Sequence, residues 1–506
     1  MKMLGLLAVT GAQLAVAGLL VPQAGHPAAR SPQGRPGDGL RKAAVWKRAR
    51  VPPCRGVRIP VGRRIQPAID SHRPGTTFCI VAGNHRISRP LIAKSGDRFI
   101  GARGAVVSGA KLLVGFERSG RWWSIGGQAE QNPATVGRCS SNSSDGCQLA
   151  NDVYEDDRVL RRVVSLSALG PGRFYFDYEQ QRIYLGSSPR GHKLEVGVAT
   201  RAWQGVGVGA YDVTIQGLTI EKFANEAQIG AIEAGRGWVV EDSEVRLNHG
   251  GGISDATITR RNYVHDNGQI GIGGNAPDLV VADNEISFND YAGFCTCWEA
   301  GGGKWSRARH LVVRDNNVHD NIGPGLWTDT DNIDVLYAHN VVRRNTGVGI
   351  FHETSFDAVI RDNVVTGNGR AWTGWLDGAG ILINSSPNIQ IYGNTVLNNK
   401  DGIGITQWDR GSSPTLGPHQ VHDISVHDNT VALHTGFSGM LQGVGDVTYY
   451  TSRNIRFDRN TYRLGCNEHY FVWQGTAAVG YSAVTSSEWR ASGMDRNGHF
   501  SSICRH

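Results

Sequence analysis

Two stretches of the chain set the pattern from which its fold can be predicted. Residues 316–326 read NNVHDNIGPGL, and residues 340–350 read NVVRRNTGVGI. Each begins with Asn-x-Val, carries a second Asn five residues after the first, and ends with Gly followed by an aliphatic residue. A match at fixed offsets over whole segments indicates a repeated structural unit and disfavours a β-sandwich, which alternates without such a period.

The same pattern extends over more than two hundred residues. The first Asn and its aliphatic partner occur at Asn262/Val264, Asn284/Ile286, Asn316/Val318, Asn340/Val342, Asn363/Val365, Asn394/Val396 and Asn429/Val431, with degenerate copies near Asp242 and at Asn460/Tyr462. The second Asn occurs at Asn267, Asn289, Asn321, Asn345, Asn368 and Asn399. Successive first Asn residues, ending with Asn460, lie 22, 32, 24, 23, 31, 35 and 31 positions apart, so some units carry loops of about ten extra residues.

Units of this length predict an all-β, right-handed parallel β-helix. Each unit forms one coil of short strands joined by turns that need left-handed backbone, which Asn and Gly adopt at little cost. Stacked coils bring identical residues into register, so the Asn side chains are expected to form hydrogen-bonded ladders along the axis.

The repeat resembles the parallel β-helix repeat of secreted bacterial proteins, many of them active on polysaccharides, over about residues 201–465. Residues 111–200 break the period and resemble the small β-domain inserted between early coils of several β-helical glycoside hydrolases. The resemblance implies a β-helical carbohydrate-active protein. The predicted organisation is a signal peptide (1–29), a basic Pro-rich linker (30–53), an N-terminal cap with the first coils (54–110), the inserted β-domain (111–200), the β-helix (201–465) and a C-terminal cap (466–506).

Charge and hydropathy separate the N-terminal region from the remainder. Lys2 precedes an apolar run from Leu4 to Val21, typical of a secretory signal and short for a membrane anchor. Residues 26–64 hold eleven Lys or Arg and one acid, which gives this segment a net charge of +10. The whole chain carries +7, so removal of the segment and of Lys2 leaves 7 − 10 − 1 = −4 for the rest. The acidic body disfavours a nucleic-acid partner, and the leader is expected to be a solvated linker, with attraction to anionic cell-surface polymer as the alternative.

The eight Cys residues of a chain with an export signal predict disulfides. Proximity in the sequence favours Cys54–Cys79, Cys139–Cys147 and Cys466–Cys504, which would hold the two ends and an insertion. Cys295 and Cys297 remain, and the sequence alone leaves the connectivity open.

Alignment of the coils on the Gly of the second strand predicts a carboxylate cluster. The Gly residues taken for this alignment are Gly271, Gly293, Gly325, Gly349, Gly380 and Gly404. If the residue after Gly faces the core, the second and fourth residues after it face outward. Asp329 and Glu353 then occupy the same outward position on adjacent coils, and strand spacing of about 4.8 Å is close to the carboxylate separation of about 5–5.5 Å in retaining glycosidases. Glu299 and Asp331 are predicted to occupy matching positions on their coils, two residues beyond the position of Asp329 and Glu353. The competing interpretation of these acids is that they are turn residues bonded to local backbone.

Aromatic residues are expected to continue the site as a sugar-binding rim, because an aromatic ring with a polar edge suits a wet interface. The Gly-rich segment from Trp298 to Trp305 also holds Lys304, although a packed loop with an incidental ion pair is the alternative. His352 is at an inward position and is expected to be a core histidine. The predicted catalytic residues are Asp329, Glu353 and Glu299, and the predicted substrate-binding residues are Trp298, Lys304, Trp305, Trp327, Asp331, Trp375, Asp377 and Trp408.

These features favour an extracellular, monomeric glycoside hydrolase that acts on a polysaccharide or oligosaccharide, without cofactor or metal. One alternative is a polysaccharide lyase or epimerase, in which the acids hold Ca²⁺ and Lys304 is the base. The other is a non-catalytic glycan-binding or structural solenoid at the cell surface, because fold alone implies no activity. The sequence contains no Walker loop, dinucleotide fingerprint or HExxH motif.

Overall fold

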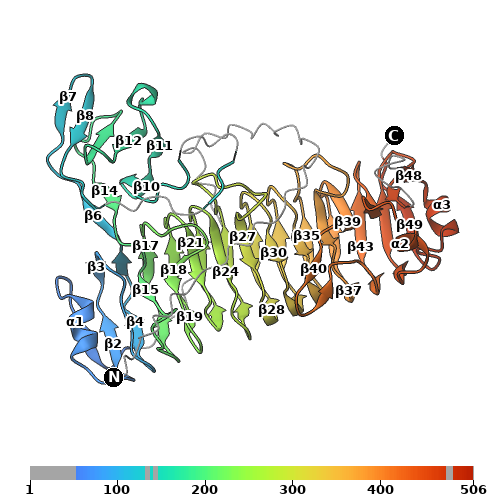
Figure 1. Ribbon diagram of the computed structural model, residues 1–506, viewed down its shortest axis with the longest axis horizontal. Helices are drawn as coiled ribbons and strands as arrows, with labels where there is room; N and C mark the ends of the chain where they lie inside the picture. The colour runs from blue at the N-terminus through green and yellow to red at the C-terminus, as the bar shows by residue number, and fades with distance from the viewer. Residues whose placement is uncertain (1–52, 131–136, 141–145, 474–481, 505–506) are drawn as a thin grey trace, which may run out of the picture.

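A computed structural model describes residues 53–130, 137–140, 146–473 and 482–504. The predicted signal peptide and nearly all of the basic linker therefore lie outside the described residues. The described chain forms an elongated stack of coils with the N-terminal coils at one end and the C-terminal coils at the other (Figure 1). Among the described helices, none is long and apolar enough to cross a membrane.

Three long sheets run along the stack, and a typical coil contributes one strand to each sheet. The first has the order β1 (Val57–Ile59), β2 (Thr77–Ile80), β4 (Arg98–Gly101), β16 (Thr214–Gln216), β19 (Val239–Glu241), β22 (Ile258–Arg260), β25 (Val280–Ala282), β28 (Arg309–Arg314), β31 (Ile333–Ala338), β34 (Phe356–Arg361), β37 (Ile389–Tyr392), β42 (Ile424–His427) and β45 (Ile455–Asp458).

The second sheet contains the strands that carry the Asn-x-Val/Ile repeat. It has the order β3 (Gly83–Arg86), β5 (Ala105–Ser108), β17 (Thr219–Glu221), β20 (Glu244–Arg246), β23 (Tyr263–His265), β26 (Glu285–Ser287), β29 (Asn317–His319), β32 (Val341–Arg343), β35 (Val364–Thr366), β38 (Thr395–Leu397), β43 (Thr430–Leu433), β46 (Thr461–Leu464) and β49 (His499–Ser502).

The third sheet contains the Gly-aliphatic strands, and we call it the site sheet. It has the order β15 (Trp203–Gln204), β18 (Gly230–Glu233), β21 (Gly251–Ser254), β24 (Ile270–Gly274), β27 (Gly301–Trp305), β30 (Leu326–Asp329), β33 (Ile350–Glu353), β36 (Ala379–Asn384), β39 (Asp401–Gln407), β44 (Ser438–Gln442), β47 (Phe471–Val472) and β48 (Ala483–Val484). Pairing along the three sheets is parallel apart from β47 with β48, so the predicted parallel β-helix is confirmed.

Two buried Asn ladders hold the coils in register, as the repeat predicts. In the first, the backbone N–H of Asn340 and its side-chain amide both donate to Asn363 Oδ1, at 2.9 and 3.0 Å. In the second, Asn345 bonds Asn368 in the same way. The left-handed backbone lies at the residue before each ladder Asn, for example Asp362 at φ 56° and Arg344 at φ 54°. The left-handed residue of each turn is therefore the one before the ladder Asn, and not the ladder Asn itself.

The Gly of the site sheet is required by the spacing between coils. A Cβ on Gly349 would lie 2.5 Å from the carbonyl oxygen of Gly380 and 2.5 Å from Val365 Cγ1. Only Gly leaves room at this position, so the Gly-aliphatic signal records how closely one coil approaches the next.

The inner faces of the three sheets enclose one continuous apolar core, and both ends of it are covered. At the N-terminal end, helix α1 (Ile65–Asp70) buries Ile65, Ala68 and Ile69. At the C-terminal end, helix α3 (Ser486–Ala491) buries Trp489, which stacks on Phe471 with ring centroids 4.8 Å apart. Helix α2 (Thr448–Thr451) and a 3₁₀ turn at Leu166–Ala168 are the other described helical segments. These covers shield the open edges of the terminal coils.

A separate β-domain projects from the early coils (Figure 1). One of its sheets has the order β10 (Arg158–Val159), β9 (Val153–Glu155), β14 (Leu194–Gly197) and β6 (Ala110–Leu112), and the other has β11 (Arg161–Val163), β12 (Arg173–Asp177), β13 (Arg182–Leu185), β8 (Trp122–Ile125) and β7 (Glu117–Ser119). The chain leaves the helix after β5 and returns at β15, and β4 and β16 still pair directly across the excursion. We call this the inserted domain.

All eight Cys residues form disulfides. The pairs favoured by proximity, Cys54–Cys79, Cys139–Cys147 and Cys466–Cys504, are confirmed. The remaining two residues, Cys295 and Cys297, pair with each other. The first and last of these bonds lie at the two ends of the helix, where a solenoid is most prone to fray.

Candidate functional site

Asp329 and Glu353 are neighbours on adjacent strands of the site sheet. Asp329 of β30 pairs in register with Glu353 of β33, and Trp327 pairs with Phe351 two residues earlier. The coil alignment predicts this placement. Parallel strands lie about 4.8 Å apart, so the two carboxyl-bearing residues start from neighbouring positions on the same outer face.

Lys304 of β27 lies beside Asp329 and links it to a third acid. Its Nζ is 2.9 Å from Asp329 Oδ2 and 3.3 Å from Glu299 Oε1, and it donates to the carbonyl oxygen of Trp298 at 2.6 Å. The ammonium group also lies 3.6 Å from the ring centroid of Trp327. Lys304 is only 6% exposed, so this cation is held by protein groups on several sides.

Hydrogen bonds fix the second oxygen of Asp329. Asp329 Oδ1 accepts from the hydroxyls of Thr354 at 3.0 Å and Thr330 at 3.1 Å. Burial works to raise the pKa of Asp329, but the charge and hydrogen bond of Lys304 bring it below the usual value. Asp329 is therefore held as a carboxylate.

The environment of Glu353 raises its pKa, in contrast to that of Asp329. Trp327 Nε1 donates to Glu353 Oε2 and Asn384 Nδ2 donates to Glu353 Oε1, each at 3.2 Å, and Arg410 forms an ion pair with Oε1. Burial raises the pKa of Glu353 and the charge of Asp329 raises it further, against the opposing charges of Arg410 and Lys304. Burial and Asp329 also raise the pKa of Glu299, which Lys304 opposes.

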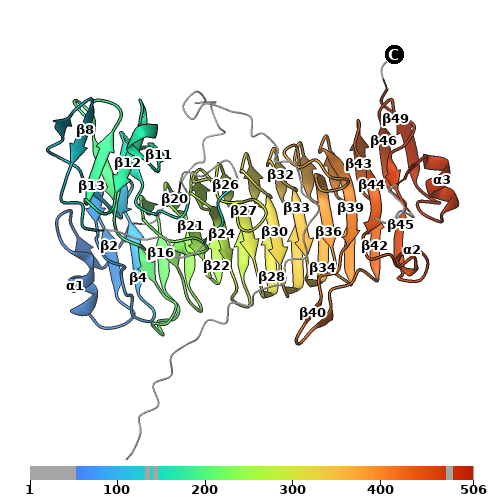
Figure 2. The same cartoon turned by 45° about the horizontal axis from the view of Figure 1, so that its top comes forward.

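One loop supplies two side chains of the site, Arg410 and His419, that are not among the predicted site residues. Arg410 and His419 flank the hairpin of β40 (Ser412–Ser413) and β41 (Gly417–Pro418), which projects from the stack in Figure 2. His419 Nε2 lies 2.9 Å from Asp331 Oδ1, and its Nδ1 lies 3.1 Å from the carbonyl oxygen of Arg410. The feature of the sequence that indicates this loop is the longest interval of the repeat, between Asn394 and Asn429. An extended loop of this kind frequently carries functional side chains.

Two predicted registers are wrong, and both errors have the same cause. Gly303 pairs with Leu326, so Gly302 and not Gly293 is the strand Gly of its coil, and Glu299 does not lie opposite Asp331. Likewise Ile381 pairs with Ile403, so Gly402 replaces Gly404 and Trp408 lies beyond the end of β39. In each coil the Gly-rich sequence offers two alignments, and inter-strand pairing decides between them. Glu299 nevertheless reaches the cluster through Lys304.

Several predicted rim aromatics are covered by protein. Trp305 is 0% exposed and lies in the core, because its side chain points inward from β27, so the predicted contact with substrate is excluded in this structure. Trp327 points outward but is 3% exposed, since it stacks on Phe351 at 5.4 Å and lies in an apolar cluster that Trp372 adjoins.

The other predicted residues form two groups. Trp298 is half-buried against Phe294 and its carbonyl oxygen binds Lys304. Trp375 and Trp408 are half-buried near Leu376 and Leu441, where Trp375 stacks on Phe437 with centroids 4.7 Å apart. Asp377 belongs to the same loop as Trp375 and is partly exposed.

The predicted core histidine, His352, is fully buried. Its Nδ1 lies 2.8 Å from Thr328 Oγ1, and burial lowers its pKa to about 3, which keeps the ring neutral. Its inward position excludes it from the carboxylate cluster on the outer face.

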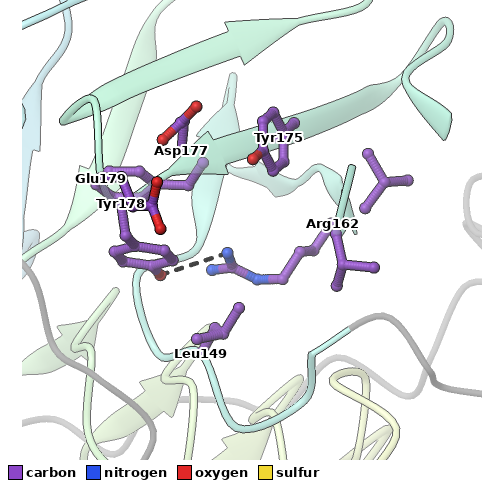
Figure 3. A pocket seen from close by; sticks show the side chains of 9 residues that line it. Leu149, Arg162, Tyr175, Asp177, Tyr178 and Glu179 are labelled. Atoms are coloured by element: carbon purple, nitrogen blue, oxygen red, sulfur yellow. Dashed lines mark hydrogen bonds between the residues drawn. The ribbon is translucent and has the colours of Figure 1, made fainter. Parts of the chain in front are cut away.

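Within the described ranges, no group of three or more His, Cys, Asp or Glu side chains is arranged to hold a metal ion. Two concavities lie away from the carboxylate cluster. One, of 310 Å³, is in the inserted domain (Figure 3), and another, of 540 Å³, is lined by Arg370, Lys400 and His434 among others. The acids of the cluster are themselves largely buried, with 16% of the Asp329 side chain and 9% of the Glu353 side chain exposed.

The class that these observations define is a β-helix protein with paired acids on one outer face, and comparison with known proteins supports the fold. Residues 209–396 match a family model described as "Right handed beta helix region". No curated protein matches the chain by sequence.

Solved structures that are similar to this chain share little sequence identity with it, and the XylC structure supports the shared fold. A complex of XylC with xylose is 16% identical, with a TM-score of 0.61 over 79% of this chain and 80% of that chain. The A-module of the mannuronan C-5 epimerase AlgE4 from Azotobacter vinelandii is 13% identical, with a TM-score of 0.48 over 87% and 95%. A family 28 exopolygalacturonase from Yersinia enterocolitica is 13% identical, with a TM-score of 0.32 over 89% and 78%. The chain is a right-handed parallel β-helix protein.

Proposed function

We propose that this protein is a secreted carbohydrate-active enzyme, and specifically a glycoside hydrolase that uses Asp329 and Glu353. The observation that carries the proposal is that two acids in register on adjacent strands have pKa values displaced in opposite directions. Such a pair supplies one ionised and one protonated carboxyl group at the same pH, which general acid catalysis with a nucleophile requires.

Export is supported by the disulfides and by the sequence of the N-terminal region. All eight Cys residues are paired, as is usual in an oxidising compartment. An extracellular β-helix with aromatic residues near an acidic cluster suits a polysaccharide, and XylC, which is similar in fold, is in complex with a sugar, xylose.

In the proposed first step, the Asp329 carboxylate attacks the anomeric carbon while Glu353 gives its proton to the glycosidic oxygen. The bond to the leaving sugar breaks, and a glycosyl ester forms on Asp329. Water then attacks the anomeric carbon as the Glu353 carboxylate removes its proton, and the bond from that carbon to Asp329 breaks. This second displacement restores both groups and releases the sugar with retained configuration. The in-register pairing favours this two-step route because it leaves little room for a water molecule between the acids.

Lys304 is a positioning residue in this scheme. It keeps Asp329 ionised through a 2.9 Å contact and holds Glu299 at 3.3 Å, so that Glu299 is a second acid with a raised pKa at the edge of the site. The partly exposed groups Asp331, Trp298, Trp375, Asp377 and Trp408 are the candidates for binding neighbouring sugar units.

The alternatives gain less support from the same contacts. As the base of a lyase or epimerase, Lys304 would have to lose its proton, yet Asp329 and Glu299 raise its pKa against the effect of burial. A purely structural or glycan-binding solenoid has no need of convergent acids, which repel each other on adjacent strands.

The test is a screen of the purified full chain on plant and microbial polysaccharides, with the anomer of the first product followed by NMR. Glu353→Gln and Asp329→Asn are expected to lower kcat by about 10²–10⁴-fold, whereas Asp334→Asn, an exposed Asp on the neighbouring β31, should retain activity. Products that absorb ultraviolet light would assign a lyase. Release of the inverted anomer would exclude Asp329 as nucleophile, and binding without cleavage, unchanged in Glu353→Gln, would exclude an enzyme.

A further inference from the structure

The inserted domain contains a pocket that the proposed hydrolysis does not use. Its volume of 310 Å³ is at the lower end of the range of small-molecule sites, about 300–1,000 Å³, and fits one or two sugar units. Arg162, Asp177 and Glu179 supply its charged groups, and Tyr175 and Tyr178 are among its apolar walls (Figure 3).

The aromatic walls are held in place by stacking. Tyr178 stacks on Phe176 with ring centroids 4.2 Å apart and an interplanar angle of 12°, and Tyr175 stacks on Tyr184 at 6.0 Å and 20°. Tyr175 and Tyr178 are both only partly buried, so each keeps surface open to a ligand. Fixed aromatic rings with a polar hydroxyl present the surface on which the apolar face of a pyranose packs.

Arg162 lies at the back of the pocket with hydrogen-bonding capacity to spare. It is 8% exposed, and its guanidinium group lies 4.6 Å from the ring centroid of Phe174. Its Nη2 donates to the carbonyl oxygen of Asn151 at 2.7 Å and its Nη1 to the hydroxyl of Tyr178 at a long 3.4 Å, but its Nε has no acceptor among the described residues. A buried guanidinium with unused donors is costly, and a hydroxyl-rich ligand would supply acceptors.

The charge balance identifies the class of ligand. Asp152 lies 3.7 Å from Arg162 and compensates its charge, while Asp177 and Glu179 add two acids to the pocket lining. These acids would repel the carboxylate of a uronate or a sulfate group. They are good acceptors for sugar hydroxyls, so the lining favours a neutral saccharide.

We propose that the inserted domain carries a second saccharide-binding site, in which a neutral sugar unit packs on Tyr175 and Tyr178 and bonds Arg162, Asp177 and Glu179. This site goes beyond the proposed hydrolysis and does not depend on it. It lies on a domain that projects from the early coils (Figure 1), so it would bind glycan away from the carboxylate cluster.

Calorimetric titration of the full chain carrying Glu353→Gln tests this site without hydrolysis of the probe. The probes are neutral tetrasaccharides of xylose, glucose, mannose and galactose, with tetragalacturonate as the acidic comparison. Tyr175→Ala and Glu179→Gln are the pocket variants. The matched controls are Tyr211→Ala, at an exposed Tyr of the β-helix, and Glu117→Gln, at an exposed Glu of the inserted domain.

We expect at least one neutral tetrasaccharide to bind, and Tyr175→Ala to weaken a binding event about tenfold, the equivalent of about 1.4 kcal/mol, while Tyr211→Ala leaves it unchanged. Glu179→Gln should weaken the same event and Glu117→Gln should not. The proposal is overturned if no neutral probe binds, if the pocket variants bind as their controls do, or if tetragalacturonate binds more tightly than every neutral probe. Loss of hydrolysis in Asp329→Asn with intact Tyr175-dependent binding would separate the two sites.

Discussion

Lys304 Nζ lies 2.9 Å from Asp329 Oδ2, and this ion pair distinguishes Asp329 from its neighbour Glu353. Both acids are largely buried on adjacent strands, so burial alone would raise both pKa values. Lys304 is placed beside Asp329 by the pairing of β27 with β30, whereas Glu353 is two strands away from β27. The order of the coils therefore determines which carboxyl group stays ionised.

Substitution of Lys304 by Met is expected to raise the pKa of Asp329, because a cation that favours its ionised form is removed while burial remains. If Asp329 must be ionised for activity, the acidic limb of the pH profile of kcat/KM should move to higher pH. The measurement is kcat/KM from pH 3 to 9 on the polysaccharide identified by the screen. An unchanged acidic limb would mean that Lys304 does not control the ionisation of the nucleophile.

Substitution of Arg410 by Gln should shift the alkaline limb of the pH profile of kcat/KM. Arg410 forms an ion pair with Glu353 and opposes the rise of its pKa, so its removal is expected to raise that pKa further. Since Glu353 must be protonated to act as an acid, the alkaline limb should move to higher pH. Arg453→Gln, which removes an Arg bonded to Asp446, is the matched control. A shift to lower pH would contradict the assignment of Glu353 as the acid.

The fold was predictable because each coil repeats the same physical requirement. A buried Asn amide must bond its counterparts on the neighbouring coils, and a site-sheet Gly such as Gly349 must leave room for the next backbone. These requirements recur at Asn340, Asn363 and Asn394, so the sequence exposes them as a period. The adjacency of Asp329 and Glu353 followed from the same period.

The remainder of the site depends on loops, which the period does not constrain. Arg410 approaches Glu353 from a hairpin 57 residues further along the chain, and nothing in the coil register places it there. Trp305 is predicted on the rim because its Gly-rich segment is interpreted as a loop. That segment instead forms β27, and pairing with β30 turns the Trp305 side chain into the core. Trp327 does face outward, but the cluster near Trp372 covers it.

The Asn ladder predicts a measurable loss of stability when one member is removed. The side chain of Asn340 donates to Val313 O at 2.9 Å and Asn363 Oδ1 at 3.0 Å, and accepts from Asn316 Nδ2 at 3.0 Å. Asn340→Ala should therefore lower the free energy of unfolding by about 2–4 kcal/mol, because buried groups are left without partners. Asn275→Ala, at an exposed Asn, is the control in urea denaturation. Equal midpoints for the two variants would show that the ladder adds no net stability.

The ion pair between Glu244 and His265 predicts a stability contribution confined to mildly acidic pH. Burial works to raise the pKa of Glu244, but the hydrogen bond from His265 and the charge of Arg246 bring it from 4.5 to about 2. Its contribution is therefore complete above pH 4.5 and is lost as the pH falls toward 2. Burial works to lower the pKa of His265, but hydrogen bonds to Asp266 and Glu244 raise it above 6.5. That contribution is complete below pH 6.5 and is lost as the pH rises through the folded pKa.

Between about pH 4.5 and 6.5 both contributions are present. Glu244→Gln should therefore destabilise the protein most in that interval, by about 1–2 kcal/mol once the partial exposure of the pair is taken into account. The measurement is urea denaturation of wild type, Glu244→Gln and the exposed control Glu117→Gln at pH 3, 5.5 and 8. The difference between Glu244→Gln and wild type should shrink at pH 3, where the carboxyl group begins to protonate, and should also shrink as the pH rises through the folded pKa of His265. A difference that does not change with pH would show that the pair acts through packing and not through charge.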